Sequence, residues 1–156
     1  MTIIGMGNPE MGDDGIGVHL LERLQGEIEG GTWAAPRAEG LALVSAGNDP
    51  VAAAACLVDG EPAFIIDAVD MKAAPGEFRV FSPEEAEFAR CAPGCSTHTL
   101  ALRDALSMAG ALGAGRIRIM GIQIGDARPG RGLSARLSRC VSDMIAKIKE
   151  EVELLS

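Results

Sequence analysis

The sequence predicts a three-layer α/β/α fold built on a mainly parallel, twisted sheet of about five strands. Apolar runs of strand length alternate with segments of helical periodicity along the whole chain, and such alternation places parallel strands between two helical layers. The 156 residues are 47% apolar, which is enough for one hydrophobic core. Residues 1–156 are therefore expected to form a single domain without a linker or an internal repeat.

Five apolar runs are expected to be the strands. The run Ala63–Val69, which follows Pro62, is apolar at nearly every position and predicts a central strand. The run that ends at Phe81 alternates between polar and apolar residues and predicts a half-exposed strand. In chain order the five runs are Thr2–Met6, Leu41–Ser45, Ala63–Val69, Glu77–Phe81 and Arg116–Ile124.

Four helices are expected between and after these runs. The first occupies about Gly15–Glu29, where apolar residues recur every three or four positions. A short helix follows Ser82, because Ser82 and Glu85 form a capping-box pattern around Pro83. A longer helix is expected over about His98–Leu112, and the last helix begins at the Ser134 cap and carries one apolar stripe.

Charge and composition exclude several classes of function. The net charge of −8 argues against a nucleic-acid-binding protein, since phosphate contacts need a basic face. No segment approaches the roughly 18 apolar residues of a membrane span, and the N-terminus has no signal-peptide pattern. The expectation is a soluble, cytoplasmic protein that binds neither nucleic acid nor membrane. The sequence leaves the oligomeric state open, and a monomer is compatible with it.

The turn after the first strand, Gly5–Gly17, is rich in glycine and carboxylates. The first thirty residues hold six acidic residues and one basic residue. A phosphate-binding loop presents amides with a lysine or arginine, whereas this loop presents Asp13 and Asp14, which suits a cation. The alternative is that one of the two aspartates caps the first helix, and the two roles can be divided between them.

Two further residues at strand or helix ends extend this set. Asp67 stands inside an apolar run, where a carboxylate is costly unless it is paired, hydrogen-bonded or bound to metal; its alternative is a solvated acid, a role that suits Asp70 better. His98 precedes a helix, whose positive end favours a neutral imidazole that can ligate metal. Together with an acid from the glycine turn they form an open O,O,N site that suits nickel, manganese, iron or zinc.

His98 also has competing interpretations. A lone histidine is more often a capping or packing residue, as is expected for His19 within the first helix. Cys91, Cys95 and His98 have the spacing of three zinc ligands, but no fourth cysteine or histidine lies nearby, so ordinary free thiols are the favoured interpretation. No Ser/His/Asp arrangement is evident. Cys95, three residues before His98, is a weak candidate for a nucleophile.

Five short motifs follow one another between residues 3 and 125. They are the glycine turn Gly5–Gly17, Ile66-Asp67-Ala68, Pro75-Gly76-Glu77, Thr97-His98 and Gly121-Ile122-Gln123. In this order they resemble the hydrogenase maturation endopeptidases. The segment from Asp67 to Glu77 looks most like the branch that serves formate-hydrogenlyase-type (hydrogenase-3) enzymes.

The resemblance implies an endopeptidase that removes the C-terminal extension of a nickel–iron hydrogenase large-subunit precursor after nickel insertion. The family's nickel-recognising residues carry over onto Asp14, Asp67 and His98, which are therefore the expected metal-binding and catalytic residues. The nickel arrives with the substrate precursor, so the free enzyme is expected to be metal-empty.

One departure concerns the segment after the second strand. The family has Asp-Gly-Gly-Thr/Ser there, whereas this chain has Ser45-Ala46-Gly47-Asn48, so the acid is absent and its role is lost or passes to Asn48 or Asp49. Gly47 and Asn48 are the expected contacts to an extended substrate peptide.

Two functions of other classes remain as alternatives. A non-catalytic metal chaperone or assembly partner for the same precursor would use the same ligands without cleaving it. A nucleotide-binding module is disfavoured, because the acidic turn matches a dinucleotide fingerprint only at Gly5 and Gly7. The loop from Arg128 to Arg131 is favoured as a solvated surface loop, with guidance of an acidic precursor as its alternative.

Overall fold

The computed structural model describes residues 1–34, 40–57, 60–88, 104, 106–108 and 116–156. Its centre is a five-stranded sheet in the order β2-β1-β3-β5-β4. Four strands are parallel, and β4 at one edge runs antiparallel to β5. The strands are β1 (Thr2–Met6), β2 (Ala42–Gly47), β3 (Ala63–Val69), β4 (Phe78–Phe81) and β5 (Ile117–Gln123).

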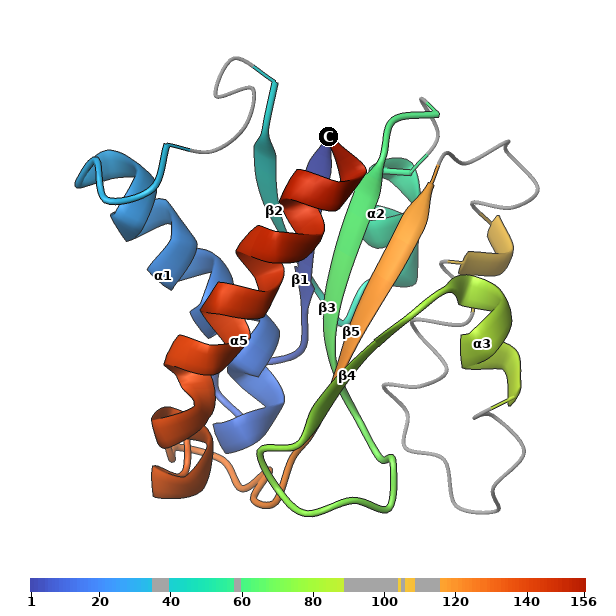
Figure 1. The fold of residues 1–156 in the computed structure, drawn as a ribbon. Coiled ribbons are helices and arrows are strands. Elements are labelled where there is room, and N and C mark those ends of the chain that lie inside the picture. The colour runs from blue at the N-terminus through green and yellow to red at the C-terminus, as the bar shows by residue number, and fades with distance from the viewer. Residues whose placement is uncertain (35–39, 58–59, 89–103, 105, 109–115) are drawn as a thin grey trace.

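Helices cover both faces of this sheet, as the alternation predicts. The helices α1 (Ile16–Glu29) and α5 (Ala135–Leu155) lie side by side on one face, and α2 (Pro50–Ala55) lies on the other (Figure 1). The short helix α3 (Pro83–Phe88) follows β4 and contacts β5. The predicted three-layer α/β fold is thus confirmed.

Two hydrophobic clusters form the core, one on each face of the sheet. The larger cluster joins the apolar stripes of α1 and α5 to the side chains of β1, β3 and β5 that point toward these helices, and Phe64 and Met120 in it are completely buried. The smaller joins α2 to the opposite sides of the same strands. Strand β3 is buried along almost its whole length, because it lies between β1 and β5 and under helices on both faces.

The capping residues predicted from the sequence mark the starts of α3 and α5. The capping box at Ser82 is formed, with the Ser82 amide donating to Glu85 Oε2 at 2.7 Å and the Glu85 amide donating to Ser82 Oγ at 3.4 Å. Ser134 caps α5 by accepting from the Leu137 amide at 3.3 Å. Of the helix predicted over His98–Leu112, only Asp104 and residues 106–108 are described, and these are helical.

One helix has no counterpart among the predicted elements. The six-residue α2 begins at Pro50 and is capped by Asp49, whose Oδ1 accepts from the amides of Val51 at 2.8 Å and Ala52 at 3.2 Å. The sequence signal was an aspartate followed by proline, which suits the first two positions of a helix. The six residues of α2 are apolar, so the sequence shows no alternation of polar and apolar faces that would predict a helix.

The glycine turn fits closely between strand and helix. A Cβ on Gly17, at the start of α1, would lie 2.3 Å from Met6 O and 2.8 Å from Ile66 O, so α1 packs directly against the ends of β1 and β3. Gly7 has a φ of +109°, and a Cβ there would lie 1.9 Å from Asp14 O. Within the described ranges, no helix is long and apolar enough to cross a membrane.

Candidate functional site

The carboxyl ends of the four parallel strands share one edge of the sheet, and buried acidic residues gather there. Asp14 belongs to η1 (Gly12–Gly15), a 3₁₀ turn between β1 and α1, and its side chain is completely buried. Its Oδ2 accepts from the Asn8 amide at 2.9 Å. The close approach of Gly7 to the Asp14 backbone holds this turn over the end of β1.

Asp67 lies near the end of β3 and is 1% exposed. Its Oδ2 has no hydrogen-bond partner in the described part of the chain. Burial raises the pKa of Asp67 well above its usual value; a hydrogen bond with the Ala68 backbone opposes this rise, and the charge of Asp14 adds to it. The two carboxyl groups therefore lie within electrostatic range of each other.

These observations decide between the two interpretations of Asp67. The solvated alternative is wrong, because the Asp67 side chain is buried where β3 pairs with β5, opposite Gly121. Asp70 is the solvated acid, and Lys72 lowers the pKa of its exposed carboxyl through a hydrogen bond to the side chain. A buried carboxylate oxygen without a protein donor is a group that a cation would satisfy.

Asp13 has a different environment from its neighbour. It is completely buried, and its two oxygens accept from three backbone amides: Gly125 at 3.2 Å, Asp126 at 3.0 Å and Ser134 at 2.6 Å. It therefore holds the loop between β5 and α5 against η1.

The prediction that Asp13 or Asp14 caps the first helix is wrong. Helix α1 begins at Ile16, and its N-cap position is held by Gly15, which has no side chain to cap it; both aspartates lie within the preceding 3₁₀ turn η1. The division of roles between the neighbours survives in another form. Asp13 bonds to a distant loop, and the charge of Asp14 acts on Asp67.

His98, the third expected ligand, lies outside the described residues, as do Cys91 and Cys95. Its role and the zinc alternative therefore stay predictions. Within the described ranges, no group of three His, Cys, Asp or Glu side chains could hold a metal ion. His19 is placed as expected on α1, partly exposed, with Nδ1 3.6 Å from Glu22 one turn away.

Gly47 ends β2 at the same edge of the sheet. Its φ is +55°, a Cβ there would meet nothing within 4 Å, and its carbonyl accepts from the Gly7 amide at 3.0 Å. The segment from Gly47 to Asn48 thus lies beside the glycine turn, and its contact with substrate stays a prediction. The carboxylate of Asp49 caps α2 and so has a structural use.

Sequence reasoning did not assign a role to Gln123, the last residue of β5. Its Oε1 accepts from the amides of Met71 at 2.7 Å and Ala73 at 3.3 Å, and its Nε2 donates to Ile124 O at 3.1 Å. It therefore holds the loop that follows β3, next to Asp67. The available signal was a polar residue at the end of a buried strand, the same signal that singled out Asp67.

The sequence matches a known protein family. A sequence model described as hydrogenase maturation protease matches residues 18–154, which is most of the chain. The chain belongs to the hydrogenase maturation protease family. It is therefore a peptidase of hydrogenase maturation, and proteases of this family act on hydrogenase large-subunit precursors by cleaving the C-terminal extension.

Solved structures of this family have the same fold. The [NiFe] hydrogenase maturation protease HybD from Thermococcus kodakarensis is 26% identical, with 97% of each chain covered and a TM-score of 0.75. The hydrogenase maturating endopeptidase HybD from E. coli is 22% identical, with 94% of this chain and 88% of that chain covered and a TM-score of 0.78.

The HycI protease from Thermococcus kodakarensis is 22% identical, with 97% of this chain and 91% of that chain covered and a TM-score of 0.75. Because HybD and HycI proteins match similarly well, assignment to the hydrogenase-3 branch stays a prediction. No match was found among curated protein sequences.

Proposed function

We propose that this maturation protease cleaves its large-subunit precursor only after nickel has been inserted, and that Asp14, Asp67 and His98 engage the nickel that the precursor carries. The observation that carries the proposal is the buried Asp67 oxygen, which has no hydrogen-bond partner among the described residues and lies within electrostatic range of a second buried carboxyl group. Such a pair is destabilising in the absence of a cation, and a metal centre docked on it would remove the penalty.

The division of labour follows from where each residue lies. Asp67 is held rigidly by the central strand, and Asp14 is held by the 3₁₀ turn that the glycine packing keeps in place. Rigid placement of both carboxylates would orient a docked nickel centre and, with it, the adjoining peptide bond. His98 would supply a neutral nitrogen ligand, as its predicted place before a helix favours.

The extended C-terminal tail of the precursor would pass the end of β2. Gly47 leaves open space there, so main-chain contacts from Gly47 and Asn48 to a peptide meet no side-chain obstacle at Gly47. We also keep the cytoplasm, predicted from the sequence, as the place of the reaction.

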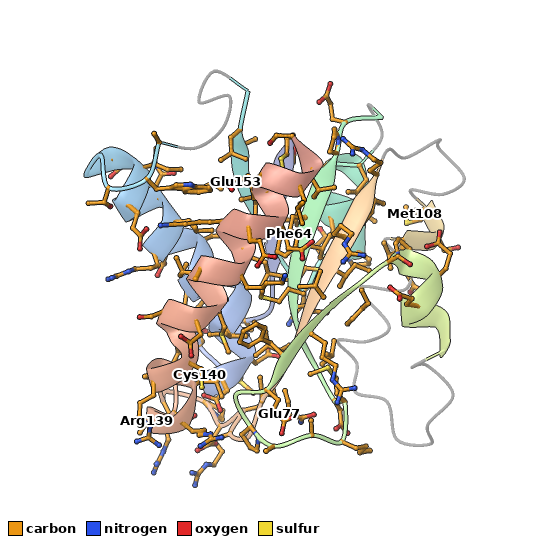
Figure 2. The ribbon with its side chains drawn as sticks, in the orientation of Figure 1. Phe64, Glu77, Met108, Arg139, Cys140 and Glu153 are labelled. Atoms are coloured by element: carbon orange, nitrogen blue, oxygen red, sulfur yellow. The ribbon has the colours of Figure 1, made fainter. Side chains whose placement is uncertain are left out.

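The experiment compares processing of nickel-loaded and nickel-free precursor by the wild-type protein and by Asp14→Ala and Asp67→Ala. We expect a shortened large subunit only from the nickel-loaded precursor and only with the wild-type protein. Glu153→Ala, which changes an exposed carboxylate on the last turns of α5, is the control and should process normally (Figure 2).

Other outcomes would contradict the proposal. Equal processing of both precursors would show that nickel is not the signal. Binding of the nickel-loaded precursor without shortening would identify a metal chaperone instead of a protease. Processing at the wild-type rate by either aspartate variant would remove that residue from the site.

A further inference from the structure

Four arginines gather between the end of β5 and the first turns of α5. They are Arg128, Arg131, Arg136 and Arg139, and we call them the arginine surface. Residues 126–139 carry these four and one acid, Asp126, for a net charge of +3, whereas the rest of the chain holds ten basic and 21 acidic residues, for a net charge of −11. The segment is thus a positively charged stretch of an acidic chain.

The arginine surface is attached to the same turn that carries Asp14. Asp13 accepts from amides on both sides of the loop, at Asp126 and at Ser134, and the Gly130 amide donates to Glu10 O at 2.9 Å. These bonds fix the position of the loop relative to η1. A peptide held at Asp14 would therefore meet the loop at a constant distance.

The loop and the glycine turn enclose a cleft of about 480 Å³. Pro9, Glu10 and Met11 line one wall, and residues 129–132, including Arg131, line the other. The cleft therefore adjoins η1, on the carboxyl edge of the sheet. Figure 2 shows Arg139 and Cys140 at the same end of the molecule as Glu77, which directly precedes β4.

Two of the four arginines have internal partners. Arg128 Nε donates to Asp126 Oδ1 at 2.7 Å, and this contact holds the pKa of Asp126 at about 2, so Asp126 remains ionised and its charge is used within the loop. Arg136 Nε donates to Pro75 O at 2.9 Å. Arg131 and Arg139 are exposed and form no hydrogen bond or ion pair with any other described residue, although the charge of Arg131 contributes to the lowered pKa of Asp126.

We propose that the arginine surface binds an acidic segment of the large-subunit precursor and so directs the precursor toward Asp14 and Asp67. The proposal rests on the proposed function only for the identity of the substrate. The acidic remainder of the protein repels an acidic segment elsewhere, so the arginine surface is the place where such a segment gains energy. The attraction acts between exposed charges and therefore weakens as salt rises.

The test is the processing kinetics of nickel-loaded precursor by the double variant Arg131→Glu/Arg139→Glu at low and at physiological ionic strength. We expect KM to rise about tenfold at low salt while kcat stays within about twofold. The reason is that exposed charges outside the site of cleavage act on encounter and binding and not on the bond-breaking step. The wild-type KM should rise with salt, and the KM of the variant should be nearly independent of it.

The matched control is Arg23→Glu/Arg79→Glu, which makes the same change in charge on α1 and β4, where both arginines are exposed. A KM that is unchanged in the arginine-surface variant, or raised equally in the control, would overturn the proposal. Sedimentation of both variants adds a second check. If the wild-type protein self-associates and only the arginine-surface variant does not, the surface binds another copy of this chain and the proposal is wrong.

The same assay separates this inference from the proposed function. Loss of processing in Asp67→Ala, together with an unchanged KM in Arg131→Glu/Arg139→Glu, would leave the protease function standing and remove only the role of the arginine surface. Wild-type processing by Asp67→Ala would contradict the proposed site, whatever the arginine variants do.

Discussion

Asp13 and Asp67 are equally buried and differ almost completely in their hydrogen bonds. The Asp13 carboxylate accepts from three backbone amides, whereas Asp67 Oδ2 has no partner among the described residues. Burial alone therefore does not distinguish a structural acid from a functional one. The difference teaches that the completed set of donors makes Asp13 part of the scaffold, whereas the incomplete set at Asp67 is what the proposed binding of a cation would complete.

Asp13 and Asp14 are adjacent in the sequence but lie in different surroundings. A 3₁₀ turn has three residues per turn, so consecutive side chains point about 120° apart. Asp13 can therefore bond to the loop before α5 while Asp14 accepts from the Asn8 amide and lies within electrostatic range of Asp67. Under the proposed function, the chain would thus obtain a structural and a functional carboxylate from adjacent residues.

The largest expected effect tests the functional side of the comparison. Asp67→Ala and Asp14→Ala should each lower the rate of precursor processing by at least about 100-fold, since loss of residues that only support metal ligands already costs 10–100-fold. Circular dichroism should show an unchanged fold, because each variant removes a buried charge from an acidic pair. A rate within tenfold of the wild-type rate would place that carboxylate outside the site.

The structural side predicts a large loss of stability instead. Asp13→Ala leaves three backbone amides without their acceptor and should lower the free energy of unfolding by roughly 3 kcal/mol, given the usual value of hydrogen bonds to charged groups. Asp13→Asn should also destabilise, because its NH₂ group would face an amide donor. Urea denaturation measures both, and an unchanged unfolding midpoint for Asp13→Ala would contradict the scaffold role.

A further prediction concerns His98, the expected third ligand beside Asp14 and Asp67. If it is the third ligand, His98→Ala should lower processing by at least about 10–100-fold, while Cys91→Ser and Cys95→Ser leave it nearly intact. A zinc site made of these residues predicts the reverse, with each cysteine variant releasing a bound metal and losing stability. Processing rate, metal content and thermal midpoint of the three variants decide. Stoichiometric zinc in the untreated protein, lost in both cysteine variants, would overturn the nickel role of His98.

The smallest effect concerns the energetic cost of Asp67. Burial raises the pKa of Asp67 in the folded protein, so above the unfolded pKa the folded state holds the proton more tightly than the unfolded chain does, and Asp67 lowers stability at pH 7. Asp67→Asn should raise the thermal midpoint at pH 7, by roughly 2–4 °C for each kcal/mol of penalty removed. The gain should shrink as pH falls through the raised pKa toward the unfolded value near 4. A gain that is constant with pH would assign the effect to packing.

Much of the fold could be predicted because its signals are local. The apolar runs of β1, β3 and β5, the stripes of α1 and α5 and the capping box at Ser82 each depend on residues a few positions apart. Asp67 was identifiable for the same reason, as an acid inside an apolar run. Helix α2 was missed because six alanine-rich residues carry no period.

The sequence by itself determined the elements, their alternation and the acidic character of the glycine turn, since these follow from composition and spacing along the chain. Only the tertiary structure decided which aspartate bonds to a loop more than a hundred residues away and which acts on Asp67 of β3 through its charge. It also decided that Gln123 holds the loop after β3 and that the loop carrying Arg128 and Arg131 is bonded to η1. The physical reason is that hydrogen bonds and charge interactions depend on distance in space, and the parallel sheet brings together strand ends that are far apart in sequence.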